Sequence, residues 1–162
     1  MGKPNVAVLS GFGINCETET ITAFEMAGAT AKRTHVNRLV DGELKLSDFD
    51  ILAVPGGFSF GDHLGSGRLL GNRLRFSLRE EVRAFVASKK PVIGICNGFQ
   101  ILLECGLLPG ALINNKNIKF LSKDVILEVQ NNSTIFTNKL NLGDKLKMPI
   151  AHREGNYIAN KD

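Results

Sequence analysis

The residue with the clearest chemical potential is Cys96, which lies in segment 94–100, GICNGFQ. An apolar run precedes it and an apolar helical pattern follows, so it is predicted to occupy the turn between a strand and a helix. Glycines at positions 94 and 98 allow strand and helix to approach closely, as in a nucleophile elbow. The helix N-terminus favours a thiolate, and backbone N–H groups at such a turn can bind an oxyanion. A structural cysteine beside a tight turn is the alternative, but the flanking glycines favour a nucleophile.

A second segment, 55–59 with sequence PGGFS, also follows an apolar run. A Pro-Gly pair most often marks a simple turn. Its functional interpretation is that the backbone N–H after Gly56 points at the site as a second oxyanion donor. Glycine permits such an approach because it carries no side chain that would clash.

The elements that must position these segments alternate between strand and helix. Apolar runs predict strands at 5–9, 50–54 and 91–95, and 31–35 is a plausible second strand in chain order. Helical spacing predicts helices at 17–27, 77–88 and 97–105. This alternation predicts an α/β fold with a doubly wound, mostly parallel sheet and helices on both faces. Sites in such sheets form beyond the carboxyl ends of the strands, where three Gly-rich turns (11–13, 56–57 and 96–98) would meet. The sequence pattern changes after Gly110, where strands are expected at 125–129 and 145–150 with polar connections between them.

The composition is that of an ordinary globular domain. The chain has 162 residues, of which 43% are hydrophobic and 22% charged, and its net charge of +4 is scattered along the sequence. This argues against disorder and against nucleic-acid binding. The three cysteines have no zinc spacing, so we expect no metal site and a reducing, cytoplasmic compartment. No apolar run is long enough to span a membrane.

Beyond these patterns, the chain resembles a known family along nearly its whole length. The matching segments are 55–62 (PGGFSFGD), 94–100 (GICNGFQ), 107–111 (LLPGA) and 149–155 (PIAHREG), with 15–17 (NCE) after the first strand. The elbow alone is typical of class I glutamine amidotransferases, whose fold is flavodoxin-like. The combination resembles the glutaminase subunits of phosphoribosylformylglycinamidine synthase.

The resemblance implies a role for each matching residue. Cys96 would attack the side-chain amide of L-glutamine, forming a thioester and releasing ammonia. The N–H groups of Gly57 and Asn97 would form the oxyanion hole, and Gln100 would lie beside the bound glutamine. His152 and Glu154 fall in a segment that would recognise the α-amino and carboxylate groups of glutamine.

The resemblance also implies partners. Ammonia would pass to a large synthetase subunit, which uses ATP and Mg²⁺ to convert formylglycinamide ribonucleotide to its amidine in purine biosynthesis. A small third subunit would bridge the complex. No cofactor is expected in this chain itself.

A thiol nucleophile requires a general base, and it is in the residues for this base that the sequence departs from the family pattern. In the family a Pro-His-Pro-Glu segment supplies it, and these 162 residues contain none. His152 and Glu154 have a spacing that places both side chains on one face of a strand, but they match the earlier recognition segment. His63 lies in a loop near the predicted site, and His35 lies at a strand end. Asp62 is expected to orient that loop or to cap a helix beginning near Leu64.

We therefore interpret residues 1–162 as a single amidotransferase domain whose C-terminal part is missing. The alternative is a non-catalytic or assembly component that retains the fold without a complete triad. A cysteine peptidase or chaperone-like protein with a similar elbow is disfavoured, because such proteins typically have histidine after the cysteine, whereas Asn97 follows Cys96.

Overall fold

The computed structural model describes residues 2–62 and 64–159. The chain divides into two compact units, one formed by residues 1–111 with 159–162 and the other by residues 112–158. The boundary coincides with the change in sequence pattern noted after Gly110. One amidotransferase domain over residues 1–162 stays a prediction.

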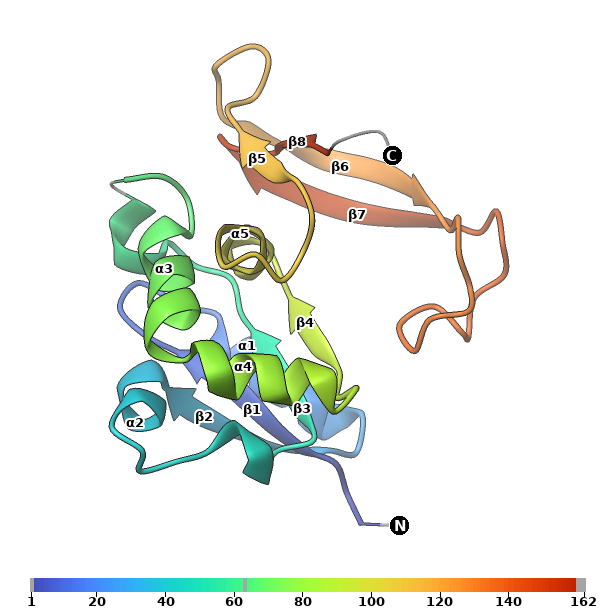
Figure 1. Cartoon of the computed structure of the whole chain (residues 1–162). Helices are drawn as coiled ribbons and strands as arrows, with labels where there is room; N and C mark the ends of the chain where they lie inside the picture. The colour runs from blue at the N-terminus through green and yellow to red at the C-terminus, as the bar shows by residue number, and fades with distance from the viewer. Residues whose placement is uncertain (1, 63, 160–162) are drawn as a thin grey trace. The chain divides into compact units, whose positions relative to one another are not determined.

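The first unit is built on a four-stranded parallel sheet (Figure 1), as the sequence predicted. Its strands are β1 (Asn5–Ser10), β2 (Thr30–His35), β3 (Ile51–Val54) and β4 (Val92–Gly94), in the order β2-β1-β3-β4. Because β1, β3 and β4 pair in parallel, the Gly-rich turns that follow them leave the same edge of the sheet.

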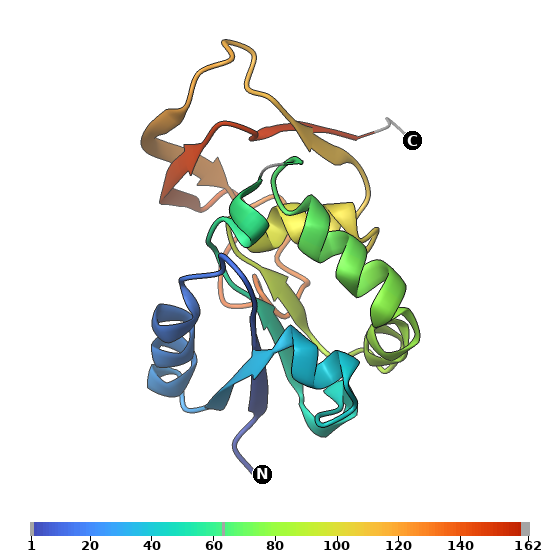
Figure 2. The same ribbon diagram turned by 90° about the vertical axis from the view of Figure 1, so that its left-hand side faces the viewer.

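Helices cover both faces of this sheet (Figure 2), which confirms the doubly wound fold class. On one face, Val6, Val8 and Ala53 pack against Ile21 and Phe24 of helix α1 (Glu17–Met26). On the other face the alternate strand residues join a larger core with the remaining helices. These are α2 (Val36–Val40), α3 (Arg68–Ser77), α4 (Arg79–Ala87) and α5 (Asn97–Glu104), with the 3₁₀ turns η1 (Leu46–Asp48) and η2 (Ser59–Asp62).

The short helix α2 follows β2 directly and was not predicted from the sequence. The helix suggested near Leu64 is α3, which begins instead at Arg68, directly after Gly67, and buries Leu70 and Leu74 on one face. The helix expected at 77–88 begins at Arg79 as α4.

The second unit contains two small sheets, each made of two strands. Strands β6 (Leu121–Glu128) and β7 (Lys145–His152) pair antiparallel over their full lengths, which confirms the strands expected in this part of the chain. The short strands β5 (Ala111–Ile113) and β8 (Asn156–Ile158) pair with each other and were not predicted. Within the residues described, helices long and apolar enough to cross a membrane do not occur.

Candidate active site

Cys96 lies between β4 and α5 in a strained backbone conformation. Its φ of 56° and ψ of −115° are unfavourable for a residue with a side chain, and its side chain is exposed. The turn is fixed on both sides, because Ile95 N–H donates to the Val54 carbonyl at 3.0 Å and Phe99 N–H donates to the Cys96 carbonyl at 2.9 Å. Strain of this kind persists only where the surroundings determine it, and it is concentrated at functional sites. The geometry is that of a nucleophile elbow.

The two glycines that flank the elbow are required by packing. A Cβ atom on Gly94 would lie 2.6 Å from both the Gly98 carbonyl oxygen and the Leu102 Cδ1. A Cβ on Gly98 would overlap the Val54 carbonyl oxygen and lie 2.7 Å from its carbon. Because those obstacles are mostly backbone atoms, they cannot move aside without displacing α5 from β3.

We expect Gly98→Ala to lower the free energy of unfolding by about 3 kcal/mol, since it forces overpacking against backbone. Gly11→Ala is the matched control, because its Cβ would make an ordinary 3.5 Å contact with Val36. Urea denaturation of both variants measures the difference. Equal stability of the two variants would contradict the close packing of the elbow.

The turns after β1 and β3 meet the elbow at the carboxyl edge. Gly56 lies against the nucleophile, since a Cβ on it would be 3.2 Å from the Cys96 Cβ. Its carbonyl accepts the N–H groups of Asn15 and Cys16, both at 3.3 Å, and Phe58 N–H donates to the Gly13 carbonyl at 2.7 Å. These bonds join the first two Gly-rich turns, and Gly56 adjoins the third, so the three turns meet at their common edge as predicted.

The two backbone groups expected to form an oxyanion hole flank this junction. Asn97 is the first residue of α5, so its N–H has no acceptor within the helix. Gly57 forms an antiparallel bridge with Ile14, and the hydrogen bonds of this bridge are two of those just described, which join residues on either side of Gly57 to the first turn. Its φ of 150° and the 2.5 Å distance from an added Cβ to the Gly13 carbonyl oxygen exclude other residues. Both groups are suitable donors, and their role stays a prediction.

The side chain of Asn97 has a structural role that the sequence analysis missed. It is 1% exposed, and its Oδ1 accepts the Ser59 N–H at 3.0 Å. Its Nδ2 donates to Gln100 Oε1 at 2.9 Å and to Asp62 Oδ1 at 3.2 Å. Asp62 Oδ1 also accepts the N–H of Gly67, the residue before α3. Of the two expected roles, Asp62 thus has the first, because it ties its loop to Asn97 and to Gly67, whereas the N-cap residue of α3 is Gly67 itself.

The other two cysteines differ from Cys96 in their surroundings. All three thiols are free. Burial raises the pKa of Cys105, which packs against the main core. Burial, followed by the nearby Glu19, also raises the pKa of Cys16. Both thiols are therefore held in the protonated, less nucleophilic form at neutral pH.

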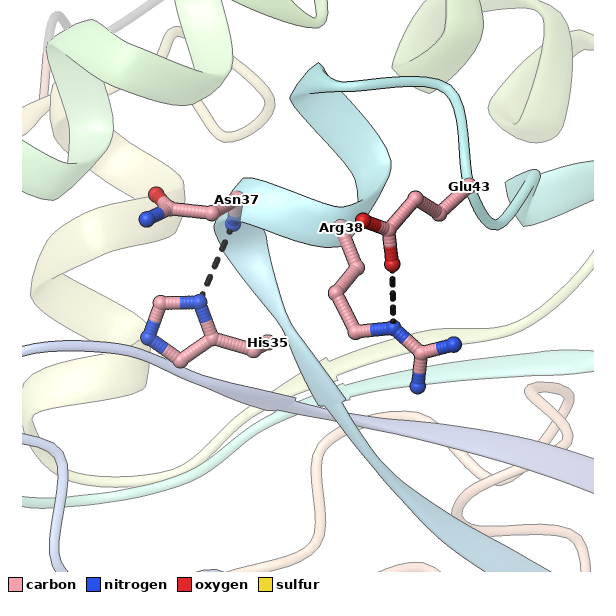
Figure 3. A network of polar contacts seen from close by, with 4 residues as sticks. All are labelled: His35, Asn37, Arg38 and Glu43. Atoms are coloured by element: carbon pink, nitrogen blue, oxygen red, sulfur yellow. Dashed lines mark hydrogen bonds and ion pairs between the residues drawn. The ribbon is translucent and has the colours of Figure 1, made fainter.

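His35 is the histidine of the first unit that lies among the described residues. His35 is the N-cap residue of α2, where its Nδ1 accepts the Asn37 N–H at 3.2 Å (Figure 3). Beside it, Arg38 and Glu43 form an exposed ion pair at 3.0 Å. This arrangement gives His35 a structural role at the start of α2. His63 lies outside the described residues.

His152 and Glu154 belong to the second unit, where a buried asparagine organises their turn. Asn115, 5% exposed, places its Oδ1 3.0 Å from His152 Nδ1 and accepts the Gly155 N–H at 3.2 Å. Its Nδ2 donates to the carbonyls of His152 and Lys119. Asn115 was not identified from the sequence, in which it is one of several asparagines in a polar connection. The predicted contacts of His152 and Glu154 with glutamine stay a prediction.

Comparison with known proteins places this geometry in a family. The profile of the CobB/CobQ-like glutamine amidotransferase domain matches residues 3–162. A phosphoribosylformylglycinamidine synthase subunit PurQ from Methanococcus maripaludis is 39% identical over 98% of this chain and 61% of its own length. The PurQ subunit of Dehalococcoides mccartyi is 39% identical over 100% of this chain and 66% of its own length. The chain therefore spans less than two thirds of the length of these relatives.

Solved structures agree with the sequence comparison. The structure of PurLQS from Thermotoga maritima contains a chain that is 38% identical, with a TM-score of 0.88 over 99% of this chain and 72% of that one. A glutamine amidotransferase from the same organism shares the fold at 15% identity, with a TM-score of 0.58 over 98% of this chain and 64% of that one. The elbow, the fold and the family profile agree, and the chain belongs to the CobB/CobQ-like glutamine amidotransferase domain family.

Proposed function

We propose that this chain carries the nucleophile of a glutaminase and uses Cys96 to release ammonia from L-glutamine. The observation that carries the proposal is the strained, exposed Cys96 at the start of α5, in contact with the Gly56 turn at the carboxyl edge of the sheet. A thiol placed at a helix N-terminus, between two backbone N–H donors, is arranged for acyl transfer from an amide.

In the proposed reaction, the Cys96 sulfur attacks the side-chain carbonyl carbon of glutamine. The carbonyl oxygen becomes an oxyanion that accepts hydrogen bonds from the Gly57 and Asn97 N–H groups. Collapse of this intermediate breaks the C–N bond, and the leaving nitrogen takes up the proton that the Cys96 thiol gave up, departing as ammonia. Water then hydrolyses the thioester, releasing glutamate and the thiol. Gln100 lies beside the substrate, and His152 and Glu154 recognise its α-amino and carboxylate groups.

The relatives suggest where the ammonia is used. Two PurQ subunits of phosphoribosylformylglycinamidine synthase and a PurLQS structure match nearly the whole chain. We propose that ammonia passes to a large synthetase subunit, which consumes ATP with Mg²⁺ to convert formylglycinamide ribonucleotide to its amidine. A small subunit bridges the complex, and the reaction takes place in the cytoplasm. The chain itself uses no cofactor.

The test of this proposal is amidine formation with the large and small subunits, ATP and Mg²⁺ present. Glutamine should support the reaction when this chain carries the Pro-His-Pro-Glu segment of a relative at its C-terminus, and Cys96→Ala should stop it. Ammonium salts should support the Cys96→Ala complex equally well, because the synthetase step is intact. Amidine formation from glutamine that survives Cys96→Ala would contradict the proposal.

A further inference from the structure

We propose that a cavity lined by residues of α3, α4 and the turn after α5 binds the phosphate group of a small phosphate monoester. The cavity has a volume of about 220 Å³, and every residue that lines it belongs to the first unit. Cys96 precedes α5 at its other end, so this site is separate from the nucleophile. The proposal does not depend on the glutaminase reaction.

The wall of the cavity is fixed where α3 packs beside α5 (Figure 2). The two helices are closest at Gly71, where an added Cβ would lie 2.7 Å from the Glu104 Cβ and 3.2 Å from the Cys105 nitrogen. One turn later on α3, the buried Leu74 lines the cavity together with Cys105. The chain leaves α5 through Gly106, where an added Cβ would meet no atom within 4 Å. The cavity is therefore packed on the side of α5 and open beside Gly106.

Three arginines line this cavity from two helices. Arg75 comes from the last turn of α3, and Arg79 and Arg83 come from α4. All three residues are exposed, and the Arg75 guanidinium lies 5.6 Å from the centre of the Phe76 ring. Arg79 and Arg83 are four positions apart, so they are neighbours on one face of α4, where like charges repel each other. The cavity thus gathers three positive charges.

No carboxylate of the described residues neutralises these charges by an ion pair. Glu104 pairs instead with Arg68 at 3.5 Å. On α4, Glu81 accepts a backbone N–H from η1, and Glu80 directly follows Arg79, a spacing at which helix side chains do not face each other. An anion in the cavity would supply the missing negative charge.

A phosphate monoester fits the charge, the size and the interior of the cavity. Its phosphate carries a charge of about −1.5 to −2 at neutral pH and offers three acceptor oxygens, one for each guanidinium group. A single carboxylate would leave most of the positive charge uncompensated. The volume lies below the range of about 300–1,000 Å³ that is typical of drug-sized ligands, so the occupant is small. Leu74, Val82 and Leu107 line the cavity as apolar side chains against which the uncharged part of the ester can pack.

The test uses phenyl phosphate as the probe and the 162-residue chain as the protein. Isothermal titration calorimetry at constant ionic strength compares phenyl phosphate with inorganic phosphate and with phenol. Cys105 reports where the probe binds, because its thiol lines the cavity and a bound ester would shield it. The rate at which iodoacetamide alkylates Cys105 at alkaline pH is measured by peptide mapping, with and without each probe.

We expect phenyl phosphate to bind more tightly than inorganic phosphate, to slow the alkylation of Cys105, and phenol to do neither. Arg79→Gln and Arg83→Gln should each weaken the binding of phenyl phosphate about tenfold or more, because each removes a charge-assisted hydrogen bond. Both variants should unfold at the wild-type temperature, since neither side chain forms an ion pair within the described part of the chain. Arg73→Gln is the matched control, because Arg73 lies on α3 outside the lining of the cavity, and it should bind as wild type does.

Three results would overturn the proposal. The first is an absence of phenyl phosphate binding to the wild-type chain. The second is binding that leaves the alkylation of Cys105 unchanged or that survives both arginine variants, since the ligand would then lie elsewhere. The third is inorganic phosphate that binds as tightly as phenyl phosphate, which would make the free ion the occupant in place of an ester.

Discussion

Cys96→Ala is expected to abolish alkylation of the chain by a diazo-ketone analogue of glutamine. Cys96 is the exposed thiol, and it is held at a helix N-terminus next to the Gly56 turn. The Cys16 and Cys105 thiols have raised pKa values, so neither should react appreciably at neutral pH. Intact-protein mass spectrometry followed by peptide mapping measures the extent and the position of labelling.

The control for this experiment is Cys105→Ala, which should be labelled at the wild-type rate because Cys105 packs in the core away from the elbow. Labelling at Cys16 or Cys105 should appear only as the pH rises toward their raised pKa values. A Cys96→Ala chain that is still labelled rapidly at neutral pH would refute the assignment of the nucleophile.

The second large effect concerns turnover. The 162-residue polypeptide is expected to hydrolyse glutamine about a hundred- to ten-thousandfold more slowly than the same chain extended with a Pro-His-Pro-Glu segment from a relative. Thiol attack and ammonia release both require a group that carries a proton. In the family a Pro-His-Pro-Glu segment supplies that group, and residues 1–162 contain no such segment. Steady-state glutamate production by the two polypeptides measures the difference.

His152→Ala distinguishes the two possible sources of the base. In the extended polypeptide, this variant should raise the KM for glutamine while leaving kcat within a few fold, as expected for a residue that only binds substrate. Strong activity of the 162-residue polypeptide that disappears in His152→Ala would instead make His152 the base, and would overturn its assignment to glutamine recognition.

The sequence predicted the parts of the fold that depend on local pattern. Continuous apolar runs predicted the strands β1, β3 and β4, because strands of a parallel sheet that are covered on both faces need no alternation, whereas β2 is a polar, largely exposed strand at the edge of the sheet. The glycines around Cys96 predicted the elbow, since only close packing of strand and helix requires them. The start of helix α3 was expected near Leu64 but lies at Arg68, because Gly67 occupies its N-cap, and Gly71 lies within the helix. Both glycines are explained by α5, since a Cβ on either would press against its residues.

The polar contacts of the site could not be predicted in the same way. The sequence predicted a role only for the backbone N–H of Asn97. Its side chain, however, bonds to Ser59 and Asp62, which are 38 and 35 residues away in the sequence. Asn115 reaches His152 across 37 residues. Such bonds depend on the tertiary arrangement, and neither periodicity nor spacing carries information about them.

The most direct test of the account is detection of the acyl-enzyme. The polypeptide is mixed with isotopically labelled glutamine and quenched in acid, and the peptide that contains Cys96 is examined by mass spectrometry. The account predicts one labelled glutamyl group on that peptide, released by hydroxylamine as expected for a thioester and absent from the Cys96→Ala chain. If glutamine is consumed while the Cys96 peptide remains unmodified, or if the glutamyl group is found on another residue, Cys96 is not the nucleophile and the proposed function is wrong.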